Sequence, residues 1–107
     1  MDIFWDRKMR ALLVLINEGM IYNDRPLFKE ILEALKRSGV AGASIFKGIL
    51  GFGRHGGFIS FDPFHGHGDS PIAILIIDRE ENIEKAKRIV KERCEEAFMV
   101  SWEVKEE

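Results

Sequence analysis

The sequence predicts an α+β fold, a ferredoxin-like βαββαβ sandwich in which a four-stranded antiparallel sheet carries two helices on one face. Strand-like and helix-like segments follow one another in the order β-α-β-β-α-β. The first and third strand segments are apolar throughout, whereas the second and fourth alternate, which is typical of two central strands flanked by two edge strands. The 107 residues, 46% of them hydrophobic, suffice for a single domain over residues 1–107.

The first half of the chain predicts a strand, a helix and a second strand. An almost unbroken run of Leu, Val and Ile indicates a buried strand over Met9–Ile16. Asn23–Pro26 supplies a capping residue and a first-turn proline for a helix whose apolar residues recur over Leu27–Leu35, before Ser38-Gly39 ends it. The mixed segment Ala43–Leu50 is expected to form the second strand.

The second half repeats this pattern. Pro71–Ile77 is a second apolar run, and Asp78 with Glu81 three residues later predicts the capped start of a helix whose apolar stripe reaches Cys94. Phe98–Val104 alternates between apolar and polar residues and predicts a last strand with one wet face. Because the helices cover one face only, the apolar central strands are expected to bury their other face against further subunits.

Composition excludes several classes of protein. Sixteen basic and eighteen acidic residues give a net charge of −2, which argues against a nucleic-acid partner bound through bulk electrostatics. No apolar run approaches the roughly 20 residues of a membrane span, and the first residues do not resemble a secretory signal. A lone Cys94 excludes a disulfide framework. We therefore expect a cytoplasmic protein that is not embedded in a membrane.

A long insertion, Gly51–Ser70, separates the second and third predicted strands. It holds six of the ten glycines, all three histidines and four of the eight phenylalanines. Connections of this length are usually binding loops or lids, and a mere spacer would be polar. The insertion is therefore the segment in which we expect the function to lie.

Several motifs, in their order along the chain, resemble the PII-like family called domain of unknown function 190, within the PII signal-transduction superfamily. They are Glu18, Pro26-Leu27, Ala41-Gly42-Ala43-Ser44, Gly48-Ile49-Leu50-Gly51-Phe52-Gly53, Ser70-Pro71 and Asp78. The resemblance covers roughly Met9 to Val104. It implies a homotrimer whose insertion corresponds to the T-loop of PII and whose inter-subunit clefts hold a small effector, usually an adenine nucleotide. It also implies regulation of a partner protein, such as a membrane transporter or an enzyme, and not catalysis.

The resemblance implies a nucleotide-binding segment at the start of the insertion, formed by Gly51, Phe52, Gly53, Arg54 and His55. Glycines there would let backbone amides approach the ligand, Phe52 would stack on the base and Arg54 would neutralise one phosphate. The stretch 92–98 corresponds to the glycine- and lysine-rich phosphate loop of PII, but it lacks glycine and is acidic. We therefore expect AMP or ADP to bind better than ATP, with no fixed cofactor.

Two alternatives remain open at this point. The pair His65 and His67, with Asp69 and Asp62 nearby, could hold zinc, copper or nickel, as in a trimer resembling the divalent-cation tolerance family. The phenylalanines of the insertion could instead dock a partner without any ligand. The sequence shows no Ser-His-Asp or Cys-His arrangement, so we predict no catalytic residues and no enzymatic activity.

Overall fold

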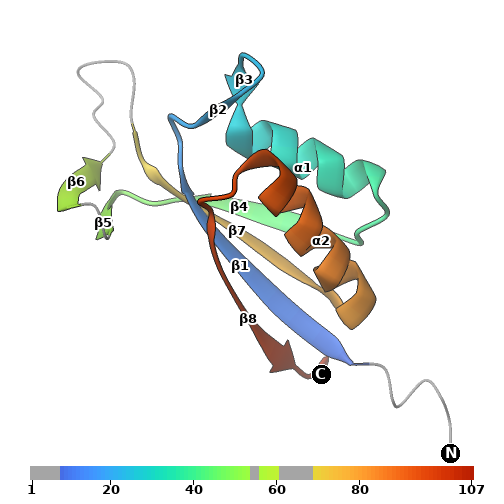
Figure 1. Ribbon diagram of the computed structural model, residues 1–107. Helices are drawn as coiled ribbons and strands as arrows, with labels where there is room; N and C mark the ends of the chain where they lie inside the picture. Colours follow the sequence, from blue (N-terminus) through green and yellow to red (C-terminus); the bar gives the residue numbers. More distant parts are fainter. Residues whose placement is uncertain (1–7, 54–55, 61–68) are drawn as a thin grey trace, which may run out of the picture.

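A computed structural model describes residues 8–53, 56–60 and 69–107 and confirms the predicted α+β fold (Figure 1). Four antiparallel strands form the main sheet in the order β4-β7-β1-β8. They are β1 (Met9–Asn17), β4 (Ala43–Lys47), β7 (Pro71–Arg79) and β8 (Phe98–Val104). The helices α1 (Leu27–Arg37) and α2 (Glu80–Arg93) lie on one face of this sheet. The first and third predicted strands are thus central, as their unbroken apolar runs indicated.

The core lies between the sheet and the two helices. Alternate residues of each central strand point toward the helices, because side chains of a strand alternate between its two faces. Leu12, Val14 and Ile16 of β1 and Ile72, Ile74 and Ile76 of β7 are all almost fully buried in this way. The helices pack against these residues through the apolar stripes that the sequence predicted, which include Ile31 and Leu35 of α1 and Ile83 and Val90 of α2.

The opposite face of the sheet is also apolar, and in the single chain it is open. The register places Leu15 opposite Phe98, Leu13 opposite Val100 and Ala11 opposite Trp102. Residues of all four strands contribute large apolar side chains that are 42–55% exposed: Leu15, Phe46, Ile77, Phe98, Val100 and Trp102. We call these six residues the open face.

Both predicted helix caps are wrong, for different reasons. Asn23 and Asp24 have φ angles of +48° and +64° and form the turn between two short strands, β2 (Ile21–Tyr22) and β3 (Arg25–Pro26). Helix α1 therefore begins after Pro26 without a side-chain cap. Helix α2 begins after Arg79, because β7 continues through Arg79.

Asp78 nevertheless has a structural role at this junction. Its carboxylate accepts hydrogen bonds from the backbone N–H groups of Ala41 (2.9 Å) and Arg79 (2.7 Å) and from the side chain of Asn82 (3.0 Å). Burial opposes the charged form, but these hydrogen bonds outweigh it and lower the pKa of Asp78. The residue thereby joins the approach to β4, the end of β7 and the start of α2.

The second predicted strand is shorter than expected, and the insertion after it begins with regular structure. Strand β4 ends at Lys47, and the Gly48 N–H donates to the carbonyl oxygen of Pro71 at 2.7 Å. A second hairpin then follows, formed by β5 (Leu50–Gly53) and β6 (Gly56–Ser60), with Leu50 opposite Ser60. It forms its own two-stranded sheet and stands apart from the helices in Figure 1. The expectation of a continuous loop over 51–70 is therefore wrong for this hairpin.

Candidate functional site

One end of the main sheet gathers three of the motifs that the family resemblance singled out, which are Glu18, Gly48–Gly53 and Ser70-Pro71. The register pairs Asn17 with Pro71 and Lys47 with Ile72, so the end of β1, the start of β7 and the end of β4 meet there. Beyond the last ladder pair, the Glu18 N–H donates to the carbonyl oxygen of Ser70 at 2.8 Å. The Lys47 ammonium lies 3.0 Å from Oε2 of Glu18. This ion pair joins the end of β4 to the residue that follows β1.

Two polar atoms at this end are buried without a hydrogen-bond partner. They are Oε1 of Glu18 and the hydroxyl oxygen of Ser70, whose residue is fully buried. An unsatisfied buried polar group costs about 1–3 kcal/mol, so folded proteins contain few of them. Within the described part of the chain, the buried side-chain atoms that lack a partner are confined to these neighbouring residues.

Three of the five predicted nucleotide-binding residues lie in strand β5. Gly51 lies next to β7, and a Cβ on it would make ordinary van der Waals contact with Pro71, 3.4 Å from its Cγ. Phe52 is 76% exposed. Arg54 and His55 lie outside the described residues. The structure thus places Gly51 and Phe52 on an exposed hairpin strand beside Ser70-Pro71.

A hollow of about 320 Å³ lies at the start of α1 and the end of α2. It is lined by Met20, Ile21 and Leu27 together with the residues 93–96. The turn after α2 is held by Lys91, whose ammonium donates to the carbonyl oxygens of Glu95 (3.0 Å) and Ala97 (3.2 Å). This turn therefore brings acidic side chains to the hollow and uses its carbonyl groups internally, which is unlike a phosphate-binding loop built from glycine N–H groups.

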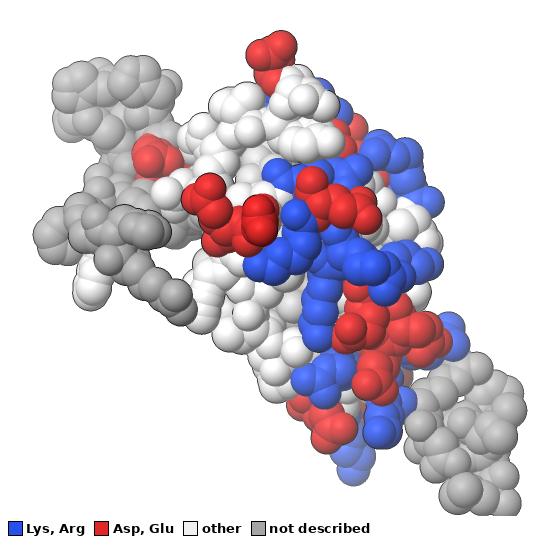
Figure 2. All heavy atoms as spheres, viewed as in Figure 1, with Lys and Arg blue, Asp and Glu red and all other residues white. Residues whose placement is uncertain are grey.

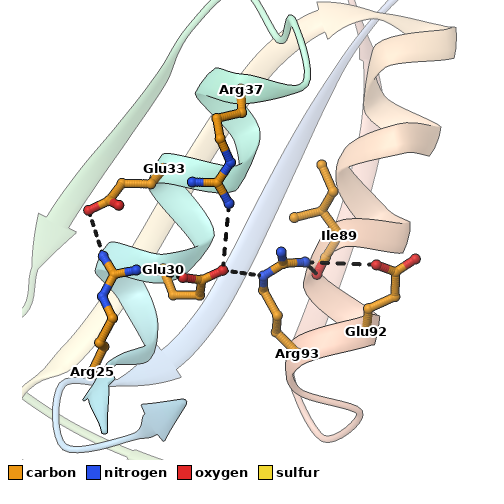
Figure 3. Close-up of polar contacts among 7 residues, drawn as sticks. All are labelled: Arg25, Glu30, Glu33, Arg37, Ile89, Glu92 and Arg93. Carbon is orange, nitrogen blue, oxygen red and sulfur yellow. Dashed lines mark hydrogen bonds and ion pairs between the residues drawn. The ribbon is translucent and has the colours of Figure 1, made fainter. Parts of the chain in front are cut away.

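A buried carboxylate fixes the position of the hollow's walls (Figure 3). Glu30 of α1 accepts hydrogen bonds from Arg25 of β3 at 2.8 Å and from Arg93 of α2 at 2.9 Å. Arg37 approaches the same carboxylate at 3.8 Å, and Arg93 also donates to the carbonyl oxygen of Ile89. The hydrogen bond from Arg93, reinforced by the surrounding positive charges, lowers the pKa of Glu30. The β2–β3 hairpin, α1 and the end of α2 are thereby joined through one side chain.

The sequence matches a family model over nearly its whole length. Residues 9–106 fit DUF190, described as an uncharacterized ACR. The chain belongs to the DUF190 family. It is 36% identical over 78 residues to the UPF0166 protein MJ1524 of Methanocaldococcus jannaschii, covering 73% of this chain and 71% of that protein. A UPF0166 protein of Aquifex aeolicus is 29% identical over 84 residues, covering 78% and 80% of the two chains.

Solved structures share the fold of this DUF190 chain at low sequence identity. One is CPII, a nitrogen regulatory PII-like protein from Thiomonas intermedia K12, bound to ADP, AMP and bicarbonate. It superposes with a TM-score of 0.64 at 19% identity, covering 91% of this chain and 88% of CPII. Another is CutA1 from Oryza sativa, with a TM-score of 0.65 at 13% identity over 94% and 84% of the chains. The predicted membership of the DUF190 family is confirmed, and so is the fold that the chain shares with these structures.

The alternative metal site of the DUF190 chain falls mostly outside the described residues. His65 and His67 lie there, so their relation to a metal stays a prediction. Asp69 is exposed, and its Oδ1 accepts a hydrogen bond from the Gly19 N–H at 3.1 Å. Among residues 8–53, 56–60 and 69–107, no group of three His, Cys, Asp or Glu side chains is arranged to hold a metal ion.

The surface over the helices of the DUF190 chain carries both signs of charge. Figure 2 shows basic and acidic side chains interspersed across this side of the molecule. Such a surface does not provide the one-signed field that nucleic-acid binding through phosphates requires. Among the described residues, no helix is long and apolar enough to cross a membrane.

Two features of the site could not be found from the sequence. The hollow depends on how α1 and α2 are placed. The sequence showed only that the stretch 92–98 is acidic and lacks the glycines of a phosphate loop, and not that part of it lines a hollow. The cluster around Glu30 unites residues 25, 30, 37 and 93, whose spacing follows no motif. A glutamate inside the apolar face of a predicted helix was the one available signal, because a buried carboxylate requires partners.

Proposed function

We propose that this protein is a homotrimeric regulatory protein of the cytoplasm, which responds to a ligand by binding AMP or ADP beside β5. In this proposal it has no catalytic activity, and it acts on a partner protein through the insertion that follows β4. The observation that carries the proposal is the β5–β6 hairpin, which presents Gly51 and the exposed Phe52 at the end of the sheet where Glu18, Lys47 and Ser70 also converge.

The open face supports the assembly part of the proposal. Its six apolar side chains belong to all four strands, so they form one continuous surface and not scattered contacts. Contiguous apolar surfaces of this kind mark protein–protein interfaces, and most soluble oligomers are symmetric copies of one chain. A trimer would bury this face of each subunit and would place the hairpins of neighbouring subunits around the sheet ends.

The site chemistry supports a nucleotide with few phosphates. A purine base stacked on Phe52 would gain about 1–3 kcal/mol. The exposed Glu95 and Glu96 at the hollow would repel a long phosphate chain, and the turn that carries them contains no glycine. The PII-like protein CPII, which has the same fold, was solved with ADP and AMP.

Isothermal calorimetry with AMP, ADP, ATP and cyclic AMP tests this proposal. We expect AMP or ADP to bind with a lower Kd than ATP. Phe52→Leu, which removes the ring but keeps an apolar side chain, should weaken binding about 10-fold or more, whereas Phe52→Trp keeps a stacking surface and should bind within about 3-fold of the wild type. If no nucleotide binds with a Kd below about 1 mM, the proposal is wrong, and tight binding in a parallel zinc titration would favour the metal alternative.

A further inference from the structure

The open face contains a hollow of about 330 Å³ between β4 and β7. It is lined by Gly42, Ala43, Ser44, Leu75 and Ile77. The register places Ser44 opposite Leu75, and the same antiparallel pairing, continued by one residue beyond β4, places Gly42 opposite Ile77. Small residues at the edge of the sheet therefore lie opposite large apolar residues of β7, and this difference in size forms the hollow.

The hollow can accept an apolar side chain without rearrangement. A Cβ atom on Gly42 would have no atom within 4 Å, so the space at the sheet edge is open. Ser44 is exposed, and Ile77 in the opposite wall is 48% exposed. A side chain placed in the hollow would remove the apolar surface of Ile77 from water and would displace no part of the chain that the structure describes.

The residues before β1 supply a segment of matching chemistry. The sequence of residues 1–7 places three large apolar residues, Ile3-Phe4-Trp5, between Asp2 and Asp6. Successive side chains of an extended segment point to opposite sides, so Ile3 and Trp5 share one side. An aromatic side chain such as that of Trp5 buries about 150–250 Å² when it packs, which makes it the residue of this segment that gains most from a hollow.

The start of β1 brings this segment close to the hollow. The Lys8 carbonyl oxygen accepts a hydrogen bond from the Glu80 N–H at 3.0 Å, which holds the chain at this point beside the end of β7. Ala11 pairs with Ile77, so the hollow lies two residues along the sheet from the start of β1 and between the next two strands, a distance of about 10 Å. Four extended residues span about 13 Å, so Trp5 reaches the hollow with length to spare for a change of direction.

We propose that residues 1–7 turn back over the open face and dock the Trp5 side chain in the hollow between β4 and β7. Charge favours this direction. Arg79 is exposed and lies two residues after Ile77 on β7, so both side chains project to the open face. Asp6 passes this point as the segment leaves β1, and the opposite charges attract the segment toward β7.

Docking of the segment divides the open face between two contacts. Four of its six residues belong to β1 and β8, and they are Leu15, Phe98, Val100 and Trp102. These four stay available for contact between subunits, while the segment covers the side formed by β4 and β7. The inference does not depend on the proposed nucleotide, and the alternative occupant of the hollow is a second copy of the chain.

Acrylamide quenching of Trp5 fluorescence tests the docking. The chain contains two tryptophans, so Trp102→Phe makes Trp5 the single reporter and keeps an aromatic residue on the open face. In this background Ser44→Glu places a carboxylate in the hollow, where the docked indole would leave it unpaired, and should raise the quenching constant at least about 3-fold. The matched control Ser44→Ala leaves the hollow open and should not change quenching. Equal quenching constants for Ser44→Glu and Ser44→Ala would overturn the inference.

Two further measurements on the same proteins distinguish the occupants. Ser44 is exposed at an edge strand, so both substitutions should leave the far-ultraviolet circular dichroism unchanged. Protection of Trp5 should stay constant over an about 100-fold dilution, because docking within one chain does not depend on concentration. Loss of protection on dilution would show that the segment docks on another copy, and a lower sedimenting mass of Ser44→Glu with unchanged Trp5 quenching would show that another subunit occupies the hollow. Either result would refute docking within the chain.

Discussion

Gly48 shows how a single residue determines the path of the chain into the site. A Cβ atom at this position would lie 2.6 Å from Cγ of Pro71, closer than real Cβ contacts allow. The Gly48 N–H also donates to the carbonyl oxygen of Pro71, so neither residue can move away without losing this bond. Gly48→Ala should therefore reduce the free energy of unfolding by about 1–3 kcal/mol.

Urea denaturation of Gly48→Ala measures this effect, and Gly42→Ala is its control. A Cβ at Gly42 would have no atom within 4 Å, so the added methyl should be neutral or should stabilise the protein by up to about 1 kcal/mol by restricting the unfolded chain. Equal unfolding midpoints for the two variants would contradict the tight contact with Pro71.

For single residues, the sequence predicted which ones belong to the family motifs and in which order they occur, but not their contacts. Glu18, Ser70 and Asp78 were recognised as members of a family pattern, but nothing in the sequence indicated that Glu18 and Ser70 would keep unsatisfied atoms. That property depends on the cross-strand register and on which atoms are covered, so it becomes visible only in three dimensions. Arg54 and His55 lie outside the described residues, and their roles stay predictions.

At the scale of elements, Glu30 joins α1, α2 and the β2–β3 hairpin, and this contact depends on pH. Hydrogen bonding from Arg93 lowers the pKa of Glu30 from its ordinary value of 4.5. A carboxyl whose pKa is lower in the folded state stabilises the protein above the unfolded-state pKa, and this stability is lost as the pH falls through the folded-state pKa. Glu30→Gln should therefore lower Tm by several degrees at pH 7, and the difference from the wild type should shrink below pH 4.5.

The measurement is Tm as a function of pH for the two proteins, since other carboxyl groups titrate in both and cancel in the difference. Glu33→Gln is the control, because Glu33 pairs with Arg25 at an exposed position, where ion pairs contribute little. A constant Tm difference between pH 7 and pH 3 would contradict the role given to the Glu30 carboxylate.

The periodicity of apolar residues predicted the helices and strands well, whereas single capping and turn residues predicted their ends poorly. The apolar patterns of β1, β7, α1 and α2 reflect burial of whole faces, which many residues determine together. Helix caps and turns depend on two or three residues that fit several conformations. Asn23 and Asp24 served as a hairpin turn and not as a cap, because both residue types tolerate positive φ. The β5–β6 hairpin was missed since its glycines gave a strong loop signal.

At the scale of the whole molecule, one face of the main sheet is covered and the other is open. Its core is complete on the helix side of the sheet, yet the open face leaves six large apolar side chains 42–55% exposed. Isolated hydrophobic residues on a surface are ordinary, but a continuous patch spanning four strands favours association. The sequence predicted this face from the two unbroken apolar strands, because helices can cover only one of their sides.

A lysine placed on the open face should therefore dissociate the assembly. We expect the wild type to sediment near three times 12.3 kDa, about 37 kDa, at micromolar concentration. Trp102→Lys puts a charge on the open face, where burying it unpaired would cost several kcal/mol, so this variant should sediment as a monomer. Glu103→Lys places the same residue one position later on β8, on the opposite face of the strand, and should keep the wild-type mass. A monomeric wild type, or a Trp102→Lys variant with unchanged mass, would refute assembly through this face.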